Sequence, residues 1–121
     1  MKRTILAALV ITAPAWGQTA PPPGLQRQIE TYAYFGQIDG GCSDQGMTRG
    51  IYLIDAFGDE VRPAPDYAKR TLHEWYQAGQ ERGLAALQRD KAAACTSVTA
   101  AMRARLERLA RRQLRFTDLG K

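Results

Sequence analysis

Apolar residues recur at helical spacing through most of this chain. The first run, at steps of three or four residues, comprises Leu25, Ile29, Tyr32, Ala33 and Gly36. Such spacing places side chains on one face of a helix. The pair Gly40-Gly41 is suited to end it, because glycine readily takes the left-handed cap conformation. The sequence therefore predicts a first helix from residue 25 up to this pair.

A second periodic run follows Ser43, whose side chain is typical of a helix N-cap. Its apolar members are Met47, Ile51, Ile54 and Phe57, and Gly58 ends it. Residues 51–54, IYLI, are also typical of a short β-strand. We favour a helix over residues 50–57 because no partner strand is evident, and the strand remains the alternative.

The longest predicted helix covers residues 66–89, with Pro65 suited to its first turn. Its apolar face comprises Leu72, Trp75, Tyr76, Gly79, Gly83, Ala86 and Leu87. After a break near Cys95, Thr96 or Ser97 would cap a last helix that runs to about residue 114. The apolar face of that helix comprises Val98, Met102, Leu106 and Leu109.

Taken together, these elements predict an all-α fold, a small bundle of three or four helices. A chain of 121 residues favours one domain, which we place at residues 25–116. Residues 117–121 are expected to form a frayed tail.

The start of the chain is typical of a secretory signal peptide. Lys2 and Arg3 precede an apolar stretch over residues 4–13, and small residues follow it. The best cleavage position is after Gly17, with Ala15 as the alternative. The apolar stretch is shorter than the roughly 20 residues that span a bilayer. We therefore expect a periplasmic or secreted protein with no transmembrane span after cleavage, and a flexible Pro-rich lead-in at residues 18–24.

Two cysteines lie in the mature part of the chain, Cys42 and Cys95. An even cysteine count in an exported protein indicates a disulfide. The bond would connect the junction of the first two helices to the start of the last one. Two free buried thiols are the alternative.

Charge is distributed unevenly. The whole chain has 17 Lys+Arg against 12 Asp+Glu, a net charge of +5. Without residues 1–17 the net charge is +3, and residues 98–121 alone carry +5. Five arginines lie largely opposite the apolar face of the last helix: Arg105, Arg108, Arg111, Arg112 and Arg115. They are a candidate anion-binding face for lipid headgroups, lipopolysaccharide or an acidic protein, and a solvated outer face is the alternative.

Small residues on the longest helix suggest a second candidate site. Gly79 and Gly83 share its apolar face with Trp75 and Tyr76. This arrangement predicts either a close approach of two helices or a groove that accepts a ligand or partner.

Catalytic chemistry finds little support in the sequence. His73 is the only histidine, and no nucleophile stands at a motif-like spacing from it. Two cysteines and one histidine cannot fill a four-ligand zinc site. No phosphate-binding, dinucleotide-binding or hydrolase motif occurs. We expect no enzyme activity, no cofactor, no metal and, for an exported protein, no nucleic acid partner.

The layout of the chain resembles that of small two-cysteine exported helical proteins of bacteria. The residues that carry this resemblance are Gly40-Gly41-Cys42, Trp75-Tyr76 with Gly79, and Ala94-Cys95-Thr96. It is similar more distantly to HdeA-like periplasmic acid-stress chaperones, which implies a helical body with two distant cysteines.

The function expected from these features is that of a non-catalytic exported binding or accessory domain of the cell envelope. Its partner would be an unidentified protein or an anionic envelope component, with the basic last helix as one possible contact. A small periplasmic stress chaperone is the alternative, and a small secreted enzyme is a third.

Overall fold

The computed structural model describes residues 23–119, and this part of the chain is helical without strands. The elements are α2 (Pro23–Gly40), α3 (Asp44–Val61), α4 (Asp66–Arg89), α5 (Lys91–Ser97), α6 (Ala100–Ala110) and the 3-10 turn η1 (Phe116–Asp118). The expected all-α bundle is confirmed. Residues 50–57 are helical, which excludes the strand alternative. The signal peptide, the cleavage position and most of the lead-in lie outside the described residues.

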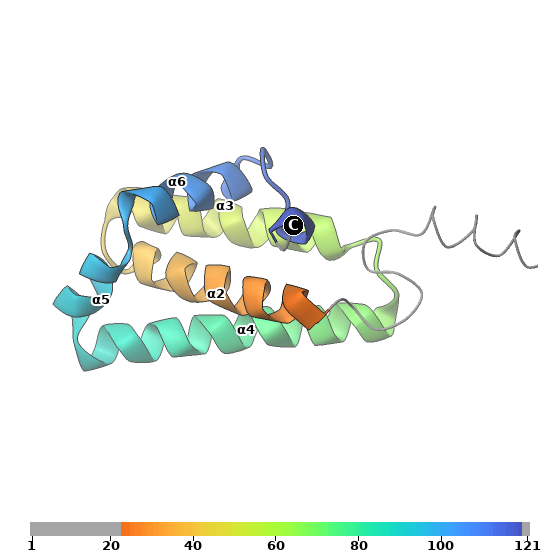
Figure 1. Ribbon diagram of the computed structural model, residues 1–121, viewed down its shortest axis with the longest axis horizontal. Helices are drawn as coiled ribbons and strands as arrows, with labels where there is room; N and C mark the ends of the chain where they lie inside the picture. Colours follow the sequence, from red (N-terminus) through yellow and green to blue (C-terminus); the bar gives the residue numbers. More distant parts are fainter. Residues whose placement is uncertain (1–22, 120–121) are drawn as a thin grey trace, which may run out of the picture.

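Helix α2 is the centre of the bundle. It lies between α3 and α4 and packs most extensively against α4, while α6 lies along α3 (Figure 1). The short helix α5 crosses the end of the bundle where α2 turns into α3. Because the other long helices pack against α2, even a short chain buries a continuous core.

The helix starts follow from side chains that bond free backbone N–H groups. Ser43 accepts a hydrogen bond from the N–H of Gly46 at 2.9 Å, as the sequence predicts. Asp90 caps α5 and Thr99 caps α6 in the same way. The predicted cap at Thr96 or Ser97 is therefore wrong, because the break in the last helical region falls after α5.

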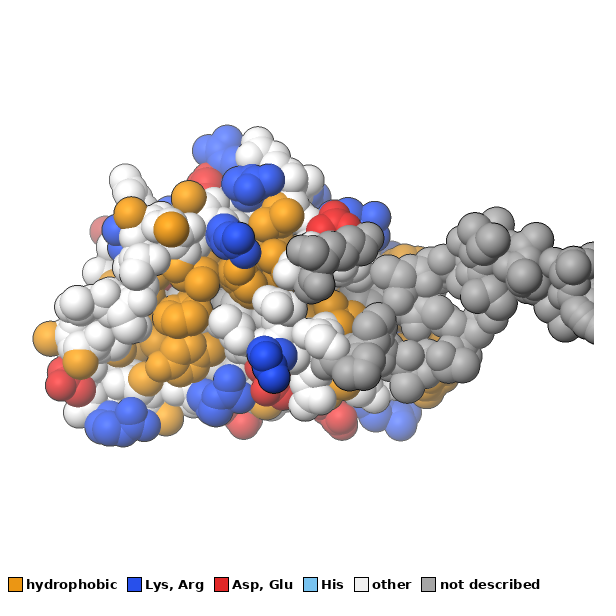
Figure 2. Space-filling model, in the orientation of Figure 1, with side chains coloured by type: hydrophobic (Ala, Val, Ile, Leu, Met, Phe, Trp, Pro, Cys, Tyr) orange, Lys and Arg blue, Asp and Glu red, His pale blue; other side chains and the backbone are white. Residues whose placement is uncertain are grey.

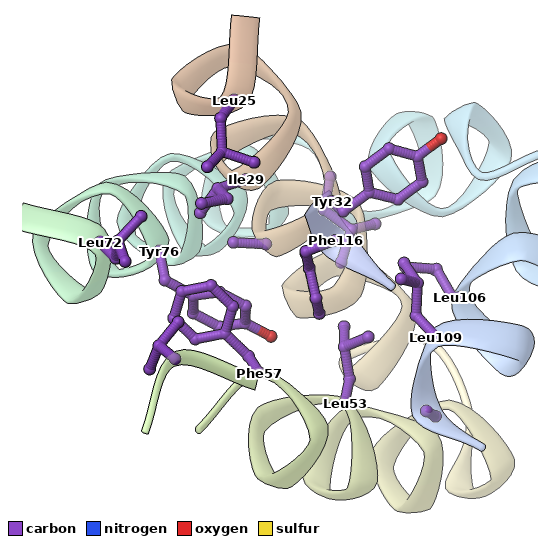
Figure 3. Close-up of a cluster of buried hydrophobic side chains, with 14 of the residues drawn as sticks. Leu25, Ile29, Tyr32, Leu53, Phe57, Leu72, Tyr76, Leu106, Leu109 and Phe116 are labelled. Atoms are coloured by element: carbon purple, nitrogen blue, oxygen red, sulfur yellow. The ribbon is translucent and has the colours of Figure 1, made fainter. Parts of the chain in front are cut away.

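The core lies between the four longer helices and η1. Figure 3 shows Leu25 and Ile29 of α2, Leu53 of α3 and Leu106 of α6 pointing into it. Phe57, Tyr76 and Phe116 form an aromatic cluster, with Phe57–Tyr76 ring centroids 4.5 Å apart and Phe57–Phe116 centroids 5.1 Å apart. Phe116 ties the C-terminal segment to the core.

Residues 117–119, which we assigned to a frayed tail, are held against the bundle. The carboxylate of Glu60 accepts hydrogen bonds from the backbone N–H groups of Phe116 and Thr117, both at 2.9 Å. Leu119 packs against the core cluster. The ordered segment therefore extends past the expected end of the domain, because an acidic side chain of α3 satisfies its free N–H groups.

One disulfide joins Cys42, in the turn between α2 and α3, to Cys95 of α5. Its S–S distance is 2.02 Å and its Cα atoms are 5.8 Å apart. The predicted pairing is confirmed, and it fixes α5 across the end of the bundle.

Candidate functional site

Three arginines of the predicted anion-binding face are already paired with carboxylates. Arg111 bonds Glu107 on its own helix, and Arg112 bonds Asp59 of α3. Arg115 lies 3.9 Å from Glu60. These ion pairs hold the three guanidinium groups against carboxylates of the same chain. Asp59 and Glu107 are each shared by two arginines, so the positive charge is only partly balanced.

The other two arginines stand apart from any carboxylate in the described chain. Arg105 donates to the hydroxyl of Tyr32 at 2.8 Å, and Arg108 is exposed. On the face shown in Figure 2, Lys and Arg side chains are spread among acidic, polar and apolar ones and form no continuous basic area. The structure thus divides the five residues into a paired group of three and an exposed pair on α6.

The paired carboxyl groups are electrostatically perturbed. Hydrogen bonds from Arg112 and then Arg62 hold the pKa of Asp59 below its ordinary value. Arg111 and then Arg49 do the same to the pKa of Glu107. The lowered pKa values keep both carboxyl groups in the anionic form that pairs with Arg111 and Arg112.

A buried charge network links three helices. Asp39 of α2 is 3% exposed, and it accepts hydrogen bonds from Arg49 of α3 at 2.8 and 3.0 Å. The same guanidinium reaches Glu107 of α6 at 3.3 Å. The hydrogen bond with Asp39 raises the pKa of Arg49. This network connects α2, α3 and α6, and sequence reasoning missed it.

The signal for this network was present in the spacing of α3. Arg49 lies three residues after Gly46 and four before Leu53, and both of these are buried. A cation at helical spacing from core residues indicates a buried partner of opposite charge.

Gly79 and Gly83 mark a close approach of α4 to α2. A Cβ atom at Gly79 would lie 2.4 Å from the carbonyl oxygen of Glu30. A Cβ atom at Gly83 would lie 2.6 Å from the carbonyl oxygen of Tyr34. These two positions therefore pack directly against backbone and form no open groove.

The aromatic neighbours of these glycines also belong to the packed interior. Burial raises the pKa of Tyr76, whose ring lies in the aromatic cluster. Trp75 is partly buried against the core. Of the two readings of Trp75, Tyr76, Gly79 and Gly83, the geometry supports close packing, although Tyr76 also reaches the edge of a neighbouring groove.

That groove is lined by residues of α3, α4 and α2 and has a volume of about 360 Å³. Its residues are apolar or uncharged: Ala33, Gly36, Gln37, Gly40, Gly41, Met47, Gly50, Ile51, Leu53, Ile54, Tyr76, Gln80, Leu84 and Leu87. Four large apolar members are about half exposed, at 56% for Met47, 58% for Ile51, 48% for Ile54 and 46% for Leu84. We call this surface the α3–α4 groove.

The exposure of these residues corrects the sequence analysis. The apolar run predicted from the sequence comprises Met47, Ile51, Ile54 and Phe57, of which only Phe57 is buried. The buried side of α3 consists of Gly46, Leu53, Ala56, Phe57 and Val61. Helix α3 therefore has two neighbouring apolar stripes, of which only one is buried. The second stripe, formed by Met47, Ile51 and Ile54, is exposed along the α3–α4 groove.

His73 makes a ring contact with Phe57 in the described structure. It is exposed, and its ring meets Phe57 edge-on with centroids 5.6 Å apart. It borders an open cleft of about 600 Å³ together with Asp55, Asp59 and Arg62. No group of three or more metal-ligating side chains occurs within residues 23–119.

No family model, no curated protein and no solved structure matches this chain. The resemblances in cysteine layout therefore stay predictions. Among the helices of residues 23–119, none is both long and apolar enough to cross a membrane.

Proposed function

We propose that this protein is a non-catalytic exported domain that binds a partner protein through the α3–α4 groove. The observation that carries the proposal is the row of half-exposed side chains Met47, Ile51 and Ile54 on α3, facing Leu84 of α4. Large apolar side chains that gather in one surface hollow are typical of interaction sites. Covering them with a partner would gain the free energy of apolar burial.

Export is supported by the disulfide between Cys42 and Cys95, because such bonds persist in oxidising compartments. The signal-like pattern of residues 1–17 points the same way. We therefore place the binding event in the periplasm or outside the cell.

A protein partner is favoured over an anionic surface by the pairing of the C-terminal arginines. Arg111, Arg112 and Arg115 are engaged with carboxylates of the same chain. Within residues 23–119, Arg105 and Arg108 have no carboxylate partner, but two cations are few for anchoring to a membrane surface, where each contributes about 1 kcal/mol.

A stress-chaperone function is the second candidate, and one observation favours it. Carboxylates hold the C-terminal part on the bundle, through Glu60 to Phe116 and Thr117 and through Asp59 to Arg112. Protonation of Asp59 in strong acid would weaken its contact with Arg112, loosen the C-terminal part and expose apolar surface. A purified protein that suppresses client aggregation at pH 3 but not at pH 7 would favour this candidate.

The experiment for the leading proposal is photocrosslinking in cells. A photoreactive residue replaces Leu84, and the label is then tested in an Ile51→Gln background and in a Tyr52→Gln background. Tyr52 is the matched control, since it lies on the same helix at 55% exposure but outside the groove. We expect a discrete protein adduct that Ile51→Gln abolishes and Tyr52→Gln retains. An adduct that both changes leave intact, or no adduct, would refute the proposal.

A further inference from the structure

No charged residue of the described chain lines the α3–α4 groove, and three acidic residues lie beside its apolar residues on the surfaces of α3 and α4. Asp44 lies three residues before Met47, Asp55 four residues after Ile51, and Glu81 three residues before Leu84. Residues three or four apart are neighbours on a helix surface. All three carboxylates belong to exposed residues, so an apolar surface is flanked by negative charge on both of its helices.

The basic residues beside the groove are turned away from it. Arg49, the only basic residue within α3, is bonded to Asp39 and Glu107 on the side of α6. Arg82, the only basic residue of α4 in the stretch that borders the groove, lies 3.3 Å from Glu30 of α2. Neither guanidinium therefore neutralises the acidic edges.

From this juxtaposition we infer that the groove binds an amphipathic helix of a partner protein whose apolar face is flanked by Lys or Arg. This inference rests on the proposed function and specifies the partner. An amphipathic helix in an apolar groove is a common recognition mode, read through side chains at helical spacing. Basic flanks on the partner helix would meet Asp44, Asp55 and Glu81, which gives the complex its orientation and its specificity.

The same charges argue against two other occupants. A symmetric pair of this chain would bring the acidic residues of both copies into one interface, because a two-fold interface uses the same patch on both sides. Anionic lipid headgroups would be repelled by the three carboxylates for the same electrostatic reason. A basic amphipathic helix is the occupant that gains from both the apolar floor and the edges.

The experiment is a selection from two displayed libraries of helical peptides, performed on the oxidised protein. Both libraries vary apolar residues at the spacing of one helix face, and they differ only in flanks of Lys or of Glu. We expect binders from the Lys-flanked library alone. Exchanging Lys for Glu in a selected binder should weaken it about tenfold, the sum of three exposed charge pairs of modest strength.

Variants of the protein assign the effect to the groove. Asp44→Asn combined with Asp55→Asn should remove most of the preference for Lys and leave binding of the apolar face, whereas Ile51→Gln should abolish binding. Tyr52→Gln is the matched control and should change neither. These residues are exposed, so the substitutions should leave the fold intact. Circular dichroism of each variant checks this.

The outcomes separate this inference from the proposed function. Equal binders from both libraries would overturn the charged-helix partner and leave a groove that binds proteins. No binders from either library, together with no adduct in the crosslinking experiment, would overturn both. Self-association abolished by Ile51→Gln, or binding to phosphatidylglycerol vesicles abolished by it, would also overturn the inference.

Discussion

The guanidinium of Arg49 donates two hydrogen bonds to the carboxylate of Asp39, from Nε to Oδ2 at 2.8 Å and from Nη2 to Oδ1 at 3.0 Å. Asp39 is almost fully buried at the end of α2, and Arg49 of α3 is its ion-pair partner. A third contact from Arg49 to Glu107 brings α6 into the same network. The guanidinium of Arg49 therefore connects α2, α3 and α6.

Replacing Arg49 with Met should destabilise the protein by about 3 kcal/mol, because it leaves the Asp39 carboxylate buried without a countercharge. The measurement is the free energy of unfolding in urea. Arg62→Met is the control, since Arg62 makes an exposed ion pair with Asp59 and its loss should cost less than about 1 kcal/mol. Equal effects of the two changes would show that the network carries no particular weight.

Sequence reasoning located the three longest helices because their apolar periodicity is local, and it located the disulfide because only one pairing of two cysteines exists. It missed α5, which covers the predicted break near Cys95, and it extended the last helix to about residue 114, whereas α6 ends at Ala110. It could not decide which stripe of α3 faces the core. Leu53 and Ile54 both lie on apolar stripes, and the packing of α3 against α2 and α6 leaves Leu53 buried and Ile54 exposed. The candidate groove depends on that choice, so it became visible only in three dimensions.

The arginine face illustrates the same limit. The helical wheel treats Arg111 and Arg112 as part of the last helix, but α6 ends at Ala110 and Arg112 has a positive φ of 60°. The wheel also contains no information about the carboxylates of α3. Asp59, the partner of Arg112, is 53 residues away in the sequence. Only the packing of α6 along α3 turns an apparently free basic face into a largely paired one.

Alanine in place of Gly79 should destabilise the protein by about 1–3 kcal/mol, although alanine favours helices more than glycine. The added Cβ atom would meet the carbonyl oxygen of Glu30 at 2.4 Å, and a backbone atom cannot rotate away. Gly58→Ala is the matched control within α3, where no atom lies within 4 Å of the new Cβ. It should be neutral or stabilise by up to about 1 kcal/mol. The midpoints of urea unfolding will show whether the two changes have opposite signs.

Acid should weaken the folded state partly through Asp59 and Glu107. The arginine partners lower the pKa of both carboxyls in the folded protein, so the unfolded chain takes up protons first as the pH falls. The stabilisation is complete above the ordinary carboxyl pKa of about 4 and is lost as the pH drops through the folded-state values.

The double variant Asp59→Asn, Glu107→Gln should therefore lose stability at pH 7 and show a shallower decline between pH 5 and 2. Melting temperatures across this range test it, with Tyr52→Gln as a non-titrating control whose decline should match the wild type. An unchanged decline in the double variant would contradict the assignment.

Glu60 should control the order of the C-terminal segment. Its side chain is 9% exposed and accepts the backbone N–H groups of Phe116 and Thr117, which leaves both donors without a partner if the carboxylate is removed. Glu60→Ala should cost about 1–3 kcal/mol, the typical penalty for losing bonds to a buried charged group. It should also accelerate amide hydrogen exchange at residues 116 and 117 while leaving the amides of α2 in the core less affected. Glu74→Ala is the control, because Glu74 is an exposed residue of α4 and its loss should leave exchange at these amides unchanged. If exchange at residues 116 and 117 is equally slow in both variants, Phe116 anchors the segment through its buried ring alone.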